Sequence, residues 1–225
     1  MDKKEKDMLE EKLNELKKKL VEEAGLAEGM VKKSIEGLIE KREEILEKVV
    51  KEYEPKMNEL EIELDELCTN LIALYQPEAG NLRTILMILK MNNDLERIGD
   101  LAVNISESAL YLVERPPVKP LIDIPRMAQE SISMLKNAVN SFINKDTKLA
   151  KSVCEKDTIV DNLKDQILRE LITYMSSDAS TIERSLHLIR ISRSLERIAD
   201  LSTNICEDVI FITEGKVIKH HKDEN

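Results

Sequence analysis

The chain carries one polar pattern twice, 100 positions apart, and the residue types in it suit the binding of a cation. Residues 95–107 read LERIGDLAVNISE and residues 195–207 read LERIADLSTNICE, with nine of the thirteen positions identical. On a helix, where each residue turns by ~100°, the polar members of each copy fall on one narrow stripe opposite the hydrophobic ones. We call these stripes the first and second acidic ridges, and they consist of Glu96, Asp100, Asn104 and Glu107, and of Glu196, Asp200, Asn204 and Glu207.

The repetition of the ridges argues against a surface that only needs to be soluble. Charged residues on an exposed helix face are ordinary, and most surface substitutions change stability by less than ~0.5 kcal/mol. Positions under so little constraint should therefore drift between two internal copies, as other parts of the two halves have done. Because the core positions and the ridge positions both match, we expect the ridges to have a role that tolerates only these side chains.

The chemistry that fits the ridges is coordination of a hard metal ion. Carboxylates four residues apart repel each other on a bare helix, and a bound cation removes that repulsion. Carboxylate and amide oxygens suit magnesium, manganese, calcium or iron. One helix cannot surround a metal, but the second half supplies a further acidic row at Asp157, Asp161 and Asp165. The sequence therefore predicts a metal site between two helices of the second half.

Each ridge glutamate is followed by an arginine, Arg97 or Arg197. At ~100° from the glutamate, these arginines flank the ridge. The spacing predicts an ion pair within the helix, from each arginine to the aspartate three residues later. A phosphate site is the alternative, but one arginine in each half is little support for it.

The composition bounds the class of protein. The chain has 225 residues, of which 42% are hydrophobic, 35% charged and only 3% aromatic, which is typical of a helical protein with an aliphatic core. The net charge of -10 argues against nucleic acid and anionic lipid as partners. It is compatible with cations and with a basic protein surface.

The three cysteines and the apolar runs predict a cytoplasmic location. Cys68, Cys154 and Cys206 have no ligand spacing, so we expect small buried side chains rather than a metal site or disulfides. The first residues have no apolar signal core, and no run approaches the ~18 apolar residues that span a membrane. Any membrane role is therefore expected to depend on a partner.

The hydrophobic periodicity predicts an all-α fold of two tandem three-helix bundles, related by a pseudo-two-fold internal repeat. A domain boundary is expected at the proline-rich linker 116–125, between an N-terminal bundle (1–115) and a C-terminal bundle (126–225). The repeat also requires a break near Lys41 to Glu44, where no clear cap is visible. The expected helical segments are 8–50 with that break, 56–75, 80–114, 126–143, 147–175 and 179–213, the last closed by Gly215.

No catalytic pattern is present, so we predict that the chain is not an enzyme. Di-iron oxidases of helical bundles use Glu-x-x-His pairs. Here Gly99 and Ala199 stand three residues after the ridge glutamates, and His220 and His221 are expected to be a solvated end. No glycine-rich phosphate loop or Ser/His/Asp set occurs. The remaining alternative is a helical docking protein whose acidic ridges bind a basic partner without metal.

Several motifs together resemble the PhoU family of bacterial phosphate-transport regulators. They are the two ridge segments, QPEAGNLR at 76–83, ERPPVKP at 114–120 and EGKVIKH at 214–220. The resemblance implies two three-helix bundles and a negative regulator of the phosphate-starvation response and of phosphate uptake. It also implies an adaptor, often dimeric, between the ATPase subunit of a phosphate ABC transporter and a sensor histidine kinase. Multinuclear iron or zinc clusters are implied as cofactors, while the ridge oxygens alone also allow magnesium or manganese.

The resemblance assigns metal ligands position by position. They are Glu96, Asp100 and Asn104 in the first half, and Asp157, Asp161, Glu196, Asp200 and Asn204 in the second. The paired aspartates expected in the first half fall on Glu54 and Asn58, with Pro55 between them. Because asparagine is a weaker ligand and proline kinks or restarts a helix, the second site is the stronger prediction.

Overall fold

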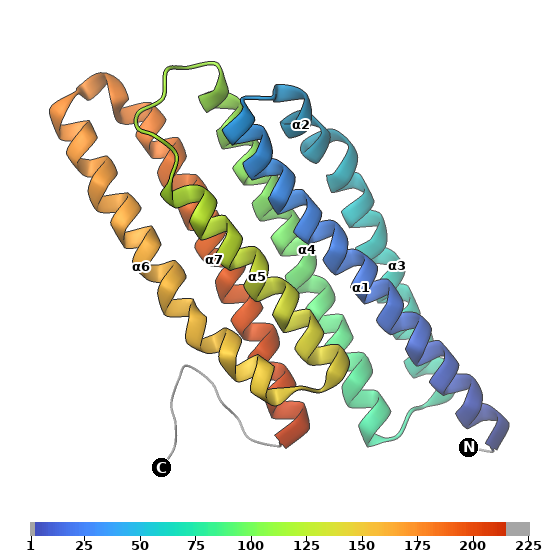
Figure 1. Ribbon diagram of the computed structural model, residues 1–225. Helices are drawn as coiled ribbons and strands as arrows, with labels where there is room; N and C mark the ends of the chain where they lie inside the picture. Colours follow the sequence, from blue (N-terminus) through green and yellow to red (C-terminus); the bar gives the residue numbers. More distant parts are fainter. Residues whose placement is uncertain (1–2, 215–225) are drawn as a thin grey trace, which may run out of the picture.

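The chain folds into long helices that run side by side (Figure 1). The computed structural model describes residues 3–214, which are almost entirely helical and contain no strand. The α-helices are α1 (Lys3–Glu40), α2 (Glu43–Lys48), α3 (Glu54–Tyr75), α4 (Ala79–Val113), α5 (Asp123–Asn144), α6 (Thr147–Ser177) and α7 (Ile182–Glu214). A π-helical turn (Val49–Tyr53) joins α2 to α3, and a 3₁₀ turn (Ala179–Thr181) leads into α7. The predicted all-α class is confirmed.

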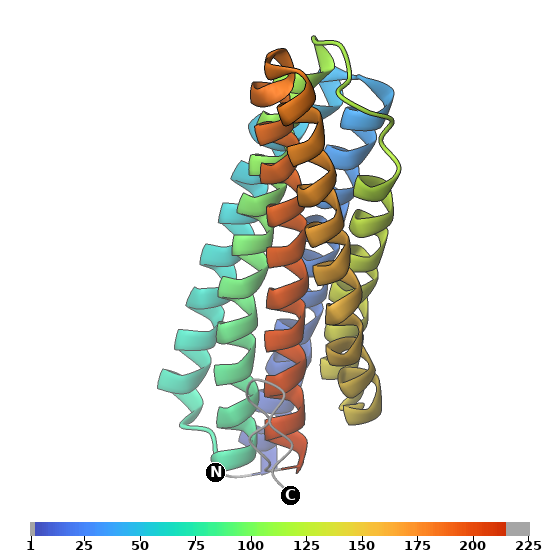
Figure 2. The same cartoon turned by 90° about the vertical axis from the view of Figure 1, so that its left-hand side faces the viewer.

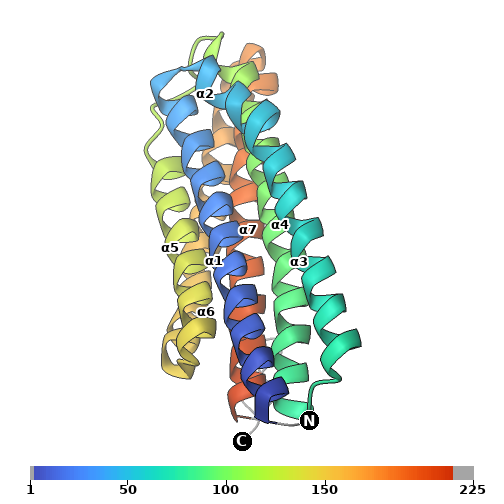
Figure 3. The same cartoon turned by 90° about the vertical axis from the view of Figure 1, so that its right-hand side faces the viewer.

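The helices form two three-helix bundles, as predicted. In the first bundle, α1 packs against α3 and α4, with α2 and the π turn extending α3 (Figure 3). In the second bundle, α5, α6 and α7 pack together. The bundles lie against each other through α4 with α7 and α1 with α5. Figure 2 shows α4 and α7 next to each other, and their colours in Figure 1 show that they run in opposite directions. Gly215, His220, His221 and the rest of the EGKVIKH motif after Glu214 lie outside the described residues.

The core is aliphatic, as the composition predicts. Leucine, isoleucine, valine and methionine side chains from all the long helices are fully buried in one continuous cluster. Burial of such side chains is the main favourable contribution to folding. Cys68 and Cys206 are buried as predicted, whereas Cys154 is half-buried.

The break after α1 falls at Lys41, inside the predicted window. Lys41 has a φ of 54°, which is the left-handed conformation that commonly ends a helix. The backbone N–H of Arg42 donates to Gly37 O at 2.9 Å and closes the turn. A Cβ on Gly37 would lie 2.6 Å from Leu46 Cδ2, so glycine allows α2 to pack closely on the end of α1.

Pro55 explains the π-helical turn before α3. Proline has no N–H to donate and its ring collides with the preceding turn of a helix. Here the backbone widens over Val49–Tyr53, and Pro55 stands in the first turn of α3, where a missing N–H costs little. The second helical segment of the first bundle thus starts at Glu43 and continues through the proline, whereas the sequence placed its start near residue 56.

The connection between the bundles is anchored at both ends. Arg184 donates to Pro116 O at 2.7 Å, and Lys119, only 9% exposed, pairs with Asp123 at 2.9 Å and also with Glu170. Helix α5 begins at Asp123, three residues before the expected start. Pro125 is therefore part of the first turn of α5, where proline is well tolerated.

Candidate functional site: the acidic ridges

Helices α6 and α7 bring two of the predicted ligands together around a lysine. Lys164 Nζ lies 3.0 Å from Asp161 Oδ1 and 3.0 Å from Glu196 Oε1. Burial lowers the pKa of Lys164, but its hydrogen bonds to Glu196 and Asp161 outweigh this effect and leave the pKa above its ordinary value. The second ridge therefore already holds a positive charge, supplied by the chain itself.

A third predicted ligand, Asp200, lies within electrostatic range of the other two. Its pKa is raised by burial and then by the nearby charges of Glu196 and Asp161, against the effect of Arg197. Arg197 Nη1 lies 3.2 Å from Asp200 Oδ2, which confirms the ion pair predicted within the helix. Asp161, Glu196 and Asp200 are thus electrostatic neighbours.

Asp157 lies on α6, outside the second ridge itself. The pKa of Cys154 is lowered by a hydrogen bond with Cys206, against the effects of burial and of two nearby carboxylates, Glu207 and Asp157. Asp157 on α6 and Glu207 on α7 therefore both lie close enough to Cys154 to affect its pKa. Asn204 lies exposed on α7.

In the first bundle, Glu96 is the ridge residue with the most restricted environment. Its pKa is raised by burial, then by the charges of Asp100 and Glu61, while Arg97 acts in the opposite direction. Asp100 and Asn104 are exposed on α4. Within residues 3–214, Arg97 forms no ion pair with Asp100, so the pairing predicted for both copies occurs only in the second.

Glu61 is a ridge neighbour that sequence reasoning missed. The same 100-residue offset that relates Glu96 to Glu196 relates Glu61 to Asp161 and Leu64 to Lys164. Counting back from Gln76-Pro77 instead places the equivalents of Asp157 and Asp161 at Glu54 and Asn58, three residues before the positions that the 100-residue offset gives, Met57 and Glu61. Glu54 begins α3 about two turns from Glu61, and its role as a ligand stays a prediction.

A second missed residue, Glu23, lies inside the first bundle. Its side chain is 0% exposed, and neither carboxylate oxygen has a hydrogen-bond partner. Burial, followed by the charges of Glu61, Glu96 and Asp65, raises the pKa of Glu23 to about 9. The helical spacing of the apolar residues could have revealed its burial, because this glutamate takes a core position in the series Leu16, Leu20, Glu23, Ala27 and Met30.

The two copies of the repeat differ at one core contact. A Cβ on Gly99 would lie 2.9 Å from Met57 Cγ, so the glycine admits the buried Met57 side chain between α3 and α4. By the 100-residue offset, the second bundle has Ala199 and Asp157 at these positions. The middle helix of the first bundle therefore carries the apolar Met57 where that of the second bundle carries Asp157, so the first bundle has fewer oxygen ligands to offer.

The residue types at the second ridge suit a hard cation, but the arrangement of their side chains does not. Asp161, Glu196 and Asp200 supply the oxygens that such ions prefer. In the part of the chain that the structure describes, however, no three Asp, Glu, His or Cys side chains converge closely enough to hold a metal. The ammonium of Lys164 stands between two of the carboxylates. Metal binding at the second ridge therefore requires Lys164 to move aside.

Both bundles match one domain family. The PhoU domain matches residues 20–109 and again residues 124–209, one match to each bundle. The chain belongs to the PhoU family. Among PhoU relatives, the phosphate-specific transport system accessory protein homolog of Aquifex aeolicus is 42% identical over 208 residues, covering 92% of this chain and 94% of that protein. A second homolog, from Thermotoga maritima, is 32% identical over 217 residues, covering 96% and 92%.

Solved PhoU structures have the same fold. The crystal structure of PhoU from Pseudomonas aeruginosa superposes with a TM-score of 0.88 at 34% identity, covering 92% of this chain and 99% of that one. The phosphate transport system regulatory protein PhoU from Streptococcus pneumoniae gives 0.85 at 24% identity, which supports the fold alone. The relatives are named accessory or regulatory proteins, and the prediction that this chain is not an enzyme is confirmed.

Within residues 3–214, no helix combines the length and the apolar character that crossing a bilayer demands.

Proposed function

We propose that this PhoU-family chain is an accessory protein of phosphate-specific transport that represses the phosphate-starvation response and limits phosphate uptake when phosphate is plentiful. It acts in the cytoplasm as an adaptor between the ATPase subunit of a phosphate ABC transporter and a sensor histidine kinase. The observation that carries this proposal is the match of both bundles to the PhoU domain, together with relatives named for phosphate transport.

The architecture supports an adaptor. Two bundles of like construction each present an acidic ridge on the third helix, α4 or α7. Such a molecule offers related surfaces to two different proteins. It reaches the membrane only through those partners. We further propose a homodimer, in keeping with the resemblance.

Metal binding at the ridges is the finer part of the proposal. Asp161, Glu196 and Asp200 would hold the ion in the second bundle, with Asp157 and Asn204 as further ligands toward Cys154. Glu96, Asp100 and Asn104 would serve in the first, with Glu54 as the weakest member. Iron or zinc clusters are the cofactors we propose first, with magnesium or manganese also compatible with oxygen donors.

A second candidate is docking of a basic partner without metal. Lys164 favours it, because this ammonium already binds Asp161 and Glu196 at 3.0 Å each. A lysine or arginine of a partner protein would meet the same carboxylate chemistry along the exposed part of the ridge. In that case the ridge recognises a protein surface and carries no ion.

Deletion of the gene tests the regulatory role. A reporter of the phosphate-starvation response should become constitutive in phosphate-rich medium, and expression of the intact chain should restore repression. Normal repression in the deletion strain would rule the assignment out.

Elemental analysis separates the two ridge functions. Purified wild-type protein should contain metal that disappears in the Asp161→Ala plus Glu196→Ala variant, while Asp146→Ala plus Glu183→Ala, away from the ridge, should retain it. If the wild-type protein carries no metal after exposure to iron, zinc or manganese, docking without metal is the better account. An unchanged reporter in the ridge variant would make the metal irrelevant to regulation.

A further inference from the structure

A groove with a basic lining lies beside the second ridge, between the two bundles. It has a volume of about 570 Å³ and is bounded by α4, α6 and α7. Four of its lining residues are cationic, namely Arg97, Lys164, Arg193 and Arg197, and one, Glu196, is acidic. The whole chain carries a net charge of -10, so a groove with a positive excess is a local reversal of the overall charge.

The packing of the bundles creates this concentration of arginines. In the sequence, Arg97 and Arg197 belong to separate halves, one in each copy of the repeat. Helices α4 and α7 pack against each other (Figure 2). Both arginines therefore line a single groove. Arg193, one turn before Arg197 on α7, adds a third guanidinium. Three guanidinium groups therefore line one groove, which is a stronger basis for an anion site than a single arginine in each half of the sequence.

Two of the four cations form no ion pair among the described residues. Lys164 is held by Asp161 and Glu196, and Arg197 pairs with Asp200. Within residues 3–214, neither Arg97 nor Arg193 forms an ion pair. Asp94 shows that Arg97 and Arg197 act on the same region, because both guanidinium groups lower its pKa, although burial leaves that pKa at about 6. The unpaired arginines are available to an external anion.

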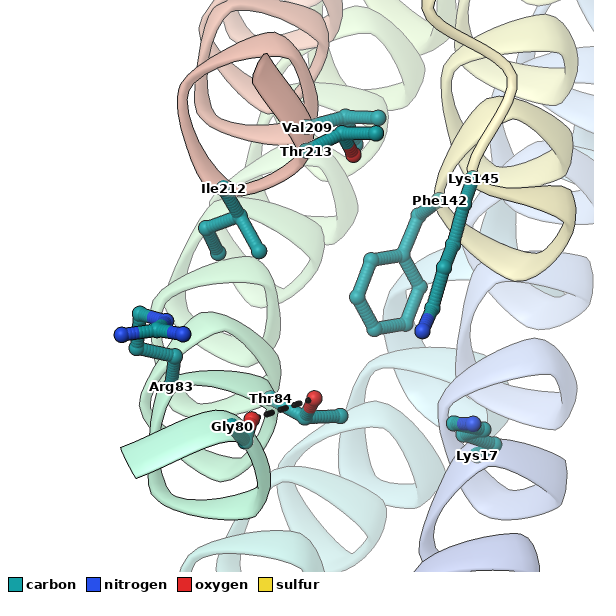
Figure 4. Close-up of a pocket in the computed structure, with 9 residues that line it drawn as sticks. All are labelled: Lys17, Gly80, Arg83, Thr84, Phe142, Lys145, Val209, Ile212 and Thr213. Atoms are coloured by element: carbon teal, nitrogen blue, oxygen red, sulfur yellow. Dashed lines mark hydrogen bonds between the residues drawn. The ribbon is translucent and has the colours of Figure 1, made fainter. Parts of the chain in front are cut away.

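A second basic pocket lacks this convergence. It has a volume of about 250 Å³, and its cationic lining residues are Lys17, Arg83 and Lys145. Figure 4 shows the guanidinium of Arg83 well apart from the two ammonium groups, across α4, while Phe142 points into the space between. Its cations are spread over a partly apolar pocket, which makes them a suitable control.

We propose that the groove lined by Arg97, Arg193 and Arg197 binds a phosphate group, either inorganic phosphate or that of a small organic phosphate. Guanidinium groups match the oxygens of phosphate with paired hydrogen bonds, which is why arginine is used so often in phosphate recognition. The groove is large enough to admit an organic phosphate as well as the free ion. This site uses different residues from the proposed metal ligands, apart from its border at Glu196, and does not depend on the adaptor role.

Isothermal titration of the purified full chain tests the site. The probes are inorganic phosphate, AMP and ATP, with sulfate as an oxyanion control, at constant ionic strength because phosphate contacts are screened by salt. We expect saturable binding of at least one phosphate probe. Arg97→Gln plus Arg193→Gln should weaken it about tenfold or more, since charge-assisted hydrogen bonds are among the strong ones. Arg83→Gln plus Lys145→Gln should leave it unchanged.

The outcomes separate the sources of the phosphate group. Binding of inorganic phosphate that the first double variant loses assigns the free ion, and binding of AMP or ATP alone assigns an organic phosphate. Both variants are checked for native helicity and thermal unfolding. The proposal is overturned if no phosphate probe binds at millimolar concentration, if sulfate binds equally well, or if the two double variants lose binding to the same extent. Such a failure would leave the genetic test of the adaptor role untouched.

Discussion

At the scale of single residues, Lys164 decides what the second ridge can hold. The equivalent position in the first bundle is Leu64, which is fully buried, so a leucine is compatible with this place in the bundle. Lys164→Leu would leave Asp161, Glu196 and Asp200 without their shared cation. We expect the metal-free variant to lose about 1–2 kcal/mol of unfolding free energy, because partly buried carboxylates then repel each other.

The same variant should bind divalent cations more tightly than the parent, since no ammonium competes for the oxygens. Thermal unfolding with and without added Mn²⁺ measures this directly. The variant should be stabilised by the ion more than the wild-type protein, and Lys136→Leu on α5 serves as the charge-matched control. An equal response of all three proteins would count against a cation site at this ridge.

Glu23 supplies a pH-dependent prediction. Its pKa in the folded chain is about 9, above its ordinary value of 4.5, so the folded state holds this proton where the unfolded state releases it. The free energy of unfolding therefore falls as the pH rises between these values. Glu23→Gln should remove this loss and stabilise the protein by about 3 kcal/mol at pH 7, with a smaller gain at pH 5.

Urea unfolding at pH 5, 7 and 8 in buffer with a chelator measures the effect. Because Glu61, Asp65 and Glu96 face Glu23, Glu22→Gln on the exposed side of the same helix is the control for a general loss of acidic charge. If Glu23→Gln were less stable than the parent at every pH, the carboxylate would have to be ionised and paired in the folded protein.

At the scale of helices, a close contact opposes intrinsic propensity at Gly99. Alanine is favoured over glycine inside a helix by up to about 1 kcal/mol. A Cβ at this position, however, would meet Met57 Cγ at 2.9 Å within a fully packed core. We expect Gly99→Ala to lose about 1 kcal/mol net, because overpacking a core costs more than propensity returns. Gly25→Ala, with nothing within 4 Å of its Cβ, should gain stability in the same chemical denaturation measurement.

Gly99 also illustrates what could and could not be predicted from the sequence. Periodicity predicted the long helices, and the internal repeat singled out Glu96 and Glu196 as candidates, because both signals can be read from the order of residues along the chain. The contact at Gly99 depends on which residue of α3 faces it, and Ala199 in the other copy gives no hint of that. Glu23 follows the core spacing of α1, but its burial is decided by the helices that cover it. Lys164 was missed for a similar reason, since its partners come from two helices.

At the scale of the whole molecule, contacts between the bundles form the groove and place a histidine at the interface. The rings of Tyr111 on α4 and His187 on α7 stack with centroids 4.0 Å apart, and Arg115 lies 3.6 Å from the Tyr111 ring. Lys90 of α4 also pairs with Asp208 of α7. These polar and aromatic contacts fix how α4 lies on α7, and with it the convergence of Arg97 and Arg197.

Protonation of His187 should loosen this contact. Burial, then the positive charge of Arg190, lowers its pKa below the ordinary 6.5, with Arg115 acting in the same direction and Glu183 against it. A histidine with a lowered pKa contributes stability that is present above pH 6.5 and is lost as the pH falls below it. His187→Phe keeps the stacked ring without the charge, so its unfolding free energy should fall less between pH 7 and 5 than that of the parent. Glu23 acts in the opposite direction over this range, so the comparison is made in the Glu23→Gln background, where equal slopes for the two proteins would contradict a role for His187.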